Sequence, residues 1–138
     1  MESIMKENTI RILEAFAYIT KRASKKNMYI VLKVFYLADK LHMERFGRFI
    51  FNDQYAALAK GPVPSLAYDL IKIIRRNQEL PFSIKAPVKV LSDHQMIPLR
   101  GANEDVFSRS DIECLDHIIE LSKNKDLGAL TQQLAAVS

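Results

Sequence analysis

The chain has 138 residues, of which 49% are hydrophobic and 26% charged, and this composition excludes a wholly disordered protein. Its length is typical of one domain, so we expect residues 1–138 to form a single domain. A lone cysteine, Cys114, excludes an intrachain disulfide and a zinc site built from cysteines, and it fits a reducing cytoplasm. No apolar run approaches the roughly 18 residues of a membrane span, and the start lacks the apolar core of a secretory signal.

The positive charge is unevenly distributed. The chain carries a net charge of +4, but residues 1–100 hold 17 basic and 9 acidic side chains, whereas residues 101–138 hold 3 and 7. A basic body of this kind serves nucleic acid binding, binding of an acidic protein, or solubility alone. Composition therefore leaves these three interpretations open.

Two helices are predicted in the first third of the chain. Apolar residues recur at three- and four-residue steps over 8–22, which predicts an amphipathic helix. A run of eleven residues beginning at Met28 contains one charged side chain, so we expect a largely buried helix over 27–46. Asn27 is placed to cap the start of this helix, and Gly47 to end it in a left-handed conformation.

A short hairpin and a third helix are predicted next. Alternating residues over 49–51, a turn at 52–53 and a return over 55–59 predict two short strands. The Gly-Pro pair at 61–62 is expected to redirect the chain. A third helix is then predicted over 64–76. Pro64 would lie in its first turn, where no N–H is needed.

Prolines at positions 81, 87 and 98 argue against helix in the following stretch. Residues 88–91 and 95–99 are predicted to form a second hairpin, with the last proline on an edge strand. A polar loop is expected over 101–107.

The last part of the chain is predicted to be helical. Ser110 and Glu113 have the spacing of a capping box, which predicts a helix over 111–122. A short alanine-rich helix is expected over 127–136. Together the elements predict an α+β fold that is mainly α: a single compact domain of about five helices with one or two short β-hairpins.

Two pairs of polar side chains lie three residues apart on predicted helices, where each pair shares a face. Asp39 and His42 would supply two metal ligands, but no third ligand follows at a recognisable spacing, which favours a polar pair at a helix end. Cys114 and His117 resemble a nucleophile and its base, but apolar neighbours favour a buried structural thiol. The sequence also lacks a phosphate-binding loop and a nucleophile elbow. We therefore expect no cofactor, no metal and no enzymatic activity.

Nucleic acid binding is the alternative suggested by charge. A recognition helix exposes several base-reading side chains, usually near its start. The helix predicted over 27–46 is too apolar for this role, and the helix over 64–76 carries its cations late. A small basic regulator that binds nucleic acid therefore remains the alternative. The cationic candidates are Lys21, Arg22, Lys25, Lys26, Arg45, Arg48, Arg75 and Arg76.

Aromatic residues are concentrated in one part of the chain. Eight of the twelve lie between positions 29 and 68. Most are expected in the core, but aromatic side chains that stay exposed are the usual anchors of protein interfaces. This pattern favours surface recognition. The eight are Tyr29, Phe35, Tyr36, Phe46, Phe49, Phe51, Tyr55 and Tyr68.

The segment from Leu32 to Lys72 carries a specific pattern. It consists of Lys33, Tyr36, Ala38 and Asp39 on a helix, then Gly47, then Ala57, Gly61, Pro62 and Val63, and finally Pro64 and Tyr68 at a helix start. This pattern resembles the signature of the Panacea domain, the family of SocA-like antitoxins. The later run FSRSDIECLDHIIE is similar to the family's late helix. The chain departs from the family at Thr131, which is followed by Gln132 where family members commonly have histidine.

The resemblance implies a cytoplasmic bacterial or phage antitoxin that is not an enzyme. Such a protein binds and neutralises its cognate toxin protein, and one family member instead delivers its toxin to a Clp-type protease. Nucleic acid and membrane are not among the implied partners. The implied partner-binding candidates are Tyr36, Asp39, Lys60, Gly61, Pro62, Val63, Pro64 and Tyr68.

The same residues also have a structural interpretation. Gly61, Pro62 and Val63 would then serve only to join the hairpin to the next helix. Tyr36 and Asp39 would lock the second helix to this turn through a buried hydrogen bond. Both interpretations remain open at the level of sequence.

Overall fold

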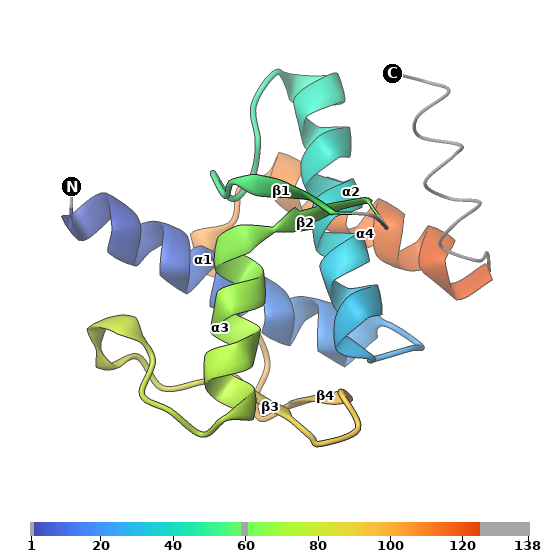
Figure 1. The fold of residues 1–138 in the computed structure, drawn as a ribbon. Coiled ribbons are helices and arrows are strands. Elements are labelled where there is room, and N and C mark those ends of the chain that lie inside the picture. The colour runs from blue at the N-terminus through green and yellow to red at the C-terminus, as the bar shows by residue number, and fades with distance from the viewer. Residues whose placement is uncertain (1, 59–60, 125–138) are drawn as a thin grey trace.

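A computed structural model describes residues 2–58 and 61–124, which form four α-helices, two short 3₁₀ turns and two antiparallel β-hairpins (Figure 1). This confirms the predicted α+β fold, mainly α, with two hairpins. The predicted helix over 127–136 lies outside the described residues. None of the described helices is long and apolar enough to cross a membrane. The elements are α1 (Glu2–Arg22), α2 (Met28–Phe46), β1 (Tyr55–Leu58), β2 (Gly61–Pro64), α3 (Ser65–Arg75), η1 (Pro81–Ser83), β3 (Val88–Val90), β4 (Met96–Pro98), η2 (Glu104–Val106) and α4 (Arg109–Asn124).

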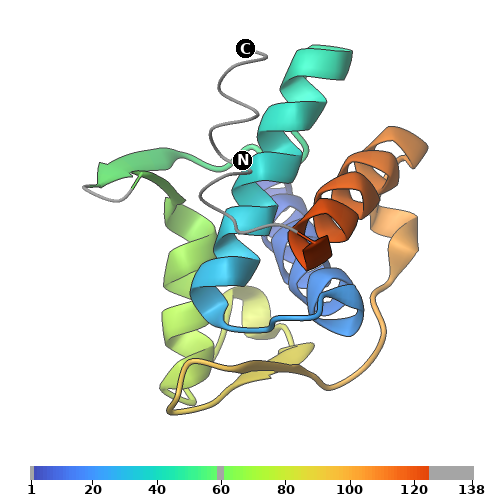
Figure 2. The same cartoon turned by 90° about the vertical axis from the view of Figure 1, so that its right-hand side faces the viewer.

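Helix α2 lies at the centre of the fold, between α3 and α4, with α1 crossing behind it (Figure 2). Most of its apolar run is buried, although Tyr29 is 57% exposed. Phe35 stacks on Phe51 with ring centroids 3.9 Å apart and also packs against Phe16. Both predicted ends are confirmed. The Asn27 side chain accepts a hydrogen bond from the Tyr29 N–H, and Gly47 adopts a left-handed conformation with φ of 76°.

Helix α1 begins at Glu2, earlier than the predicted start near Asn8. Its first turns are exposed, so they lack the apolar stripe on which the prediction depended. From Ile12 to Ile19 the helix is buried among the other helices.

The predicted register of the first hairpin is wrong. No strand forms over 49–51; instead β1 pairs with β2, so that Tyr55 lies opposite Pro64 and Ala57 opposite Pro62. The Gly-Pro pair at 61–62 therefore belongs to a strand and does not redirect the chain. Helix α3 starts at Ser65, which places Pro64 at the N-cap and not in the first turn. Two prolines fit here because residues two apart direct their nitrogens to the same side of a strand, and that side faces away from β1.

The second hairpin confirms the sequence prediction, with β3 paired to β4 and Val88 opposite Pro98. The start of α4 differs from the predicted start, which placed the capping box at Ser110 and Glu113. The capping box consists of Ser108 and Asp111: the Ser108 N–H donates to the Asp111 carboxylate at 2.9 Å, and the Asp111 N–H donates to the Ser108 hydroxyl at 3.1 Å. Ser110, predicted as the cap, lies inside the helix.

Candidate functional site

The carboxylate of Asp39 is the centre of the candidate site. It lies on α2 with no exposed surface. One oxygen accepts hydrogen bonds from the N–H groups of Ile50, at 2.6 Å, and Phe51, at 3.3 Å. The other accepts from the Tyr55 hydroxyl at 2.5 Å. Asp39 therefore makes the buried hydrogen bonds that the structural interpretation expects, but its partners are the segment that follows α2 and the first residue of β1, and not the Gly-Pro-Val segment.

Burial is the main cause of the shifted pKa values of Asp39 and Tyr55. Burial raises the pKa of Asp39, although the bonds from Tyr55, Ile50 and Phe51 favour the carboxylate. Burial and the neighbouring Asp39 also raise the pKa of Tyr55. The phenol therefore stays protonated and serves as a hydrogen-bond donor.

A second carboxylate, that of Asp53, joins the hairpin to α3. Its two oxygens accept hydrogen bonds from the N–H groups of Leu66 and Ala67, each at 2.9 Å, and from the N–H of Gln54. These groups are unpaired donors in the first turn of a helix, and Pro64 at the N-cap has no side chain that could accept from them. Asp53 therefore caps α3 from the preceding segment.

The candidate residues from the sequence lie around this frame. Tyr36 is half-buried, and its ring meets the edge of the Tyr55 ring at a centroid distance of 5.3 Å. Tyr68 is half-buried on α3, with the Lys72 ammonium 4.7 Å from its ring centroid. Gly61 is the first residue of β2. The other placements are as follows: Pro62 is exposed, Val63 half-buried and Pro64 buried, whereas Lys60 lies outside the described residues.

Two further aromatic residues stay exposed at the end of α2 and just after it. Phe46 ends α2 with 47% of its surface exposed, and Phe49 follows with 40% exposed. The Phe49 ring lies 6.5 Å from that of Tyr55. We call Tyr36, Phe49 and Tyr55 the aromatic rim. Among these three, the sequence singled out only Tyr36, because the signal for the others was no more than the concentration of aromatic residues.

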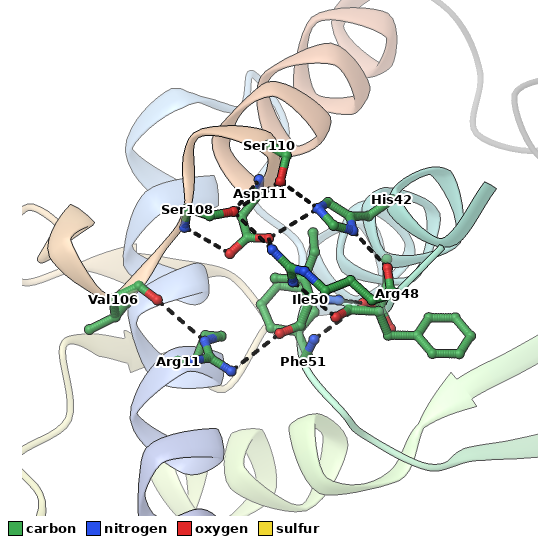
Figure 3. A network of polar contacts seen from close by, with 11 residues as sticks. Arg11, His42, Arg48, Ile50, Phe51, Val106, Ser108, Ser110 and Asp111 are labelled. Carbon is green, nitrogen blue, oxygen red and sulfur yellow. Dashed lines mark hydrogen bonds and ion pairs between the residues drawn. The ribbon is translucent and has the colours of Figure 1, made fainter. Parts of the chain in front are cut away.

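A buried polar network holds the other side of the same segment (Figure 3). His42 has no exposed surface; its Nδ1 lies 2.6 Å from the Arg48 carbonyl oxygen, and its Nε2 lies 2.8 Å from the Ser110 hydroxyl. Because a carbonyl only accepts, Nδ1 carries a proton. The Asp111 carboxylate lies 3.2 Å from Nε2 and accepts a bond from the Arg48 guanidinium at 3.1 Å. This network ties the end of α2 to the start of α4.

Arg11 adds a third tie from α1. Its guanidinium donates to the carbonyl oxygens of Val106, at 3.3 Å, and Ile50, at 3.4 Å (Figure 3). The segment from Arg48 to Phe51 is thus held by α1, α2 and α4 together. Because this segment is fixed at several points, the aromatic rim beside it would lose little conformational entropy on association.

The polar pairs considered in the sequence do not form a metal site or an activated thiol among the described residues. Asp39 and His42 bind different partners, and among residues 2–58 and 61–124 no three His, Cys, Asp or Glu side chains converge as metal ligands would. Cys114 is fully buried, as predicted, and burial raises the pKa of its thiol to about 11. A thiol of that kind is mostly protonated at neutral pH and a poor nucleophile.

Comparison with known proteins gives one match. The model of the family described as "Antitoxin SocA-like, Panacea domain" matches residues 31–134. These residues include α2 from its fourth residue on, both hairpins, α3 and α4. No curated protein and no solved structure matches the chain.

Proposed function

Because the chain belongs to the family of SocA-like antitoxins with a Panacea domain, we propose that it is the antitoxin of a toxin–antitoxin pair and neutralises its cognate toxin by direct protein–protein binding. The family match over 31–134 is the observation that carries this proposal. The protein acts by occupying the toxin and not by catalysis.

The candidate site supports a binding role. Exposed aromatic side chains are common anchors of interfaces, and Phe49 stays 40% exposed beside Tyr55, which half-buried Tyr36 also contacts. The backbone beneath them is fixed by Asp39, so little conformational entropy is lost on association. We place the toxin-binding surface here, over the aromatic rim and the hairpin formed by β1 and β2.

Co-expression with the products of the neighbouring genes tests this proposal. One of these products should arrest growth when expressed alone, and co-expression of this chain should restore growth and allow the two proteins to be purified together. A toxin that still arrests growth and forms no complex with this chain would contradict the proposal.

Delivery of the toxin to a Clp-type protease is a variant of the same function. In this mode the half-life of the toxin shortens when this chain is present. In a host that lacks the protease, the half-life returns to its original value and growth arrest returns with it. Direct neutralisation instead protects both hosts equally.

The nucleic-acid alternative has less support. Several cations that suggested it are engaged within the fold: the Arg22 guanidinium lies 3.6 Å from the Tyr18 ring centroid, and Arg48 is paired with Asp111. Binding to phosphates weakens steeply as salt rises. A salt series with duplex DNA therefore tests the alternative, which requires clear binding at low salt.

A further inference from the structure

The outer edge of β1 is an open strand edge. Ser65 donates from its N–H to the Gln54 carbonyl at 2.7 Å, so Gln54 and Ser65 are a hydrogen-bonded pair. Bonded and non-bonded pairs alternate along an antiparallel ladder. Tyr55 and Ala57 are therefore in non-bonded pairs with Pro64 and Pro62, and their N–H and C=O groups point away from β2.

These outward groups have no partner within the described part of the chain. No hydrogen bond between described residues involves the N–H of Tyr55 or Ala57. The hairpin projects from the helices, at the left of Figure 2, and β2 is the main neighbour of β1. By contrast, Pro62 and Pro64 remove the donors from the outer side of β2. The hairpin thus has one edge that can accept a further strand and one that cannot.

From this asymmetry we propose that the toxin supplies an extended segment that pairs with the outer edge of β1 and adds a third strand to the hairpin. This inference rests on the proposed function and names the surface that performs it. Strand addition provides affinity through main-chain hydrogen bonds and specificity through the side chains beside them. The backbone groups of Tyr55 and Ala57 are the main-chain partners.

The surroundings define the chemistry of the added strand. Phe49 and Tyr36 contact the Tyr55 ring, so apolar side chains of the added strand pack beside the aromatic rim. Beside the rim, the Lys33 ammonium lies 5.8 Å from the Tyr36 ring centroid, and the carboxylates of Asp39 and Asp53 are bound within the fold. The occupant is therefore an extended segment of the toxin that places apolar side chains against the aromatic rim.

Replacement of Ala57 tests the edge directly. Ala57→Pro removes the outward N–H, while the ladder to β2 keeps its bonds because residue 57 is in a non-bonded pair. Ala57→Val is the matched control, since it enlarges the same side chain and keeps the N–H. The probe is the toxin that the growth assay identifies, titrated by calorimetry into wild type and both variants. We expect Ala57→Pro to weaken binding at least about tenfold and Ala57→Val to bind within about threefold of wild type.

Amide hydrogen exchange on the wild-type protein tests the same edge without requiring that a variant fold correctly. On addition of toxin, exchange at the N–H groups of Tyr55 and Ala57 should slow at least about tenfold. Ala56 should change less, because its N–H already bonds to β2.

Three results would overturn the inference. Equal toxin binding by Ala57→Pro and Ala57→Val would exclude the β1 edge while the antitoxin function stands, as would unchanged exchange at Tyr55 and Ala57 in a formed complex. A dimer of this chain that Ala57→Pro dissociates would show that a second copy occupies the edge. Absence of any complex between the wild type and the toxin would remove the proposed function as well.

Discussion

Asp39 shows how one buried carboxylate can organise a surface that it does not itself reach. It has no exposed area, yet it holds the hydroxyl of Tyr55 and the N–H groups of Ile50 and Phe51. Its burial was not evident from its place in the sequence, where it lies next to Lys40 near the end of an apolar run. The sequence did indicate an internal hydrogen bond as one of its two possible roles, but a single residue type could not decide between them.

Removal of this carboxylate tests the residue. Asp39→Ala leaves two backbone donors and a phenol buried without an acceptor, so we expect a loss of at least about 2 kcal/mol in the free energy of unfolding. Glu44→Ala, an exposed change of an acid on the same helix, should stay within about 0.5 kcal/mol of wild type. Urea unfolding measures both. Similar stabilities for the two variants would show that the Asp39 bonds contribute little.

Among the elements, the connection between the hairpin and α3 depends on Asp53. Asp53→Ala removes both acceptors from the first turn of α3, and we expect a loss of about 1–2 kcal/mol in the free energy of unfolding. Asp69→Ala is the matched control, because Asp69 lies on the same helix and its carboxylate makes an exposed ion pair with Lys72. Thermal unfolding followed by circular dichroism distinguishes them. A cap of no consequence would leave the two variants equally stable.

Elements with local end signals were predicted well, and those set by distant contacts were not. Asn27 and Gly47 define the ends of α2 through bonds to residues within one turn, which sequence spacing shows. The register of the first hairpin depends on which strand positions need no N–H and can therefore hold a proline. Those positions are known only once the partner strand is known. The cap of α4 was misplaced by two residues because Ser108 and Ser110 both fit the spacing rule, and only Ser110 meets His42.

For the whole molecule, part of the positive charge of residues 1–100 makes contacts within the fold. Arg11, Arg48 and Arg100 all bond to groups on distant segments. These contacts join positions 63 to 95 residues apart, so no local pattern could reveal them. The remaining excess is available to guide an acidic partner to the surface.

The ion pair between Glu14 and Arg100 makes the stability of the fold depend on pH. Burial alone would raise the pKa of Glu14, but the two guanidinium bonds from Arg100, at 2.7 and 2.8 Å, and the Asn103 N–H outweigh it and lower that pKa below its ordinary value of 4.5. An acid with a lowered folded-state pKa stabilises the fold above its unfolded pKa and loses this contribution as pH falls.

We therefore expect the stability difference between wild type and Glu14→Gln to be largest at neutral pH and to shrink as pH falls below about 4.5. Glu7→Gln, an exposed change on the same helix, should match wild type at every pH. Denaturant unfolding across a pH series provides the comparison. A difference that stays constant with pH would show that the charge of Glu14 is not what stabilises the fold.

The function that we propose for this chain is to stop a toxin by binding to it. The most direct measurement is a titration of the purified toxin, at fixed concentration, with the purified chain while the activity of the toxin is followed. We expect the activity of the toxin to fall linearly and to reach its minimum at a fixed molar ratio, in the absence of any protease or nucleotide. Full toxin activity in the presence of an excess of the folded chain would contradict this proposal.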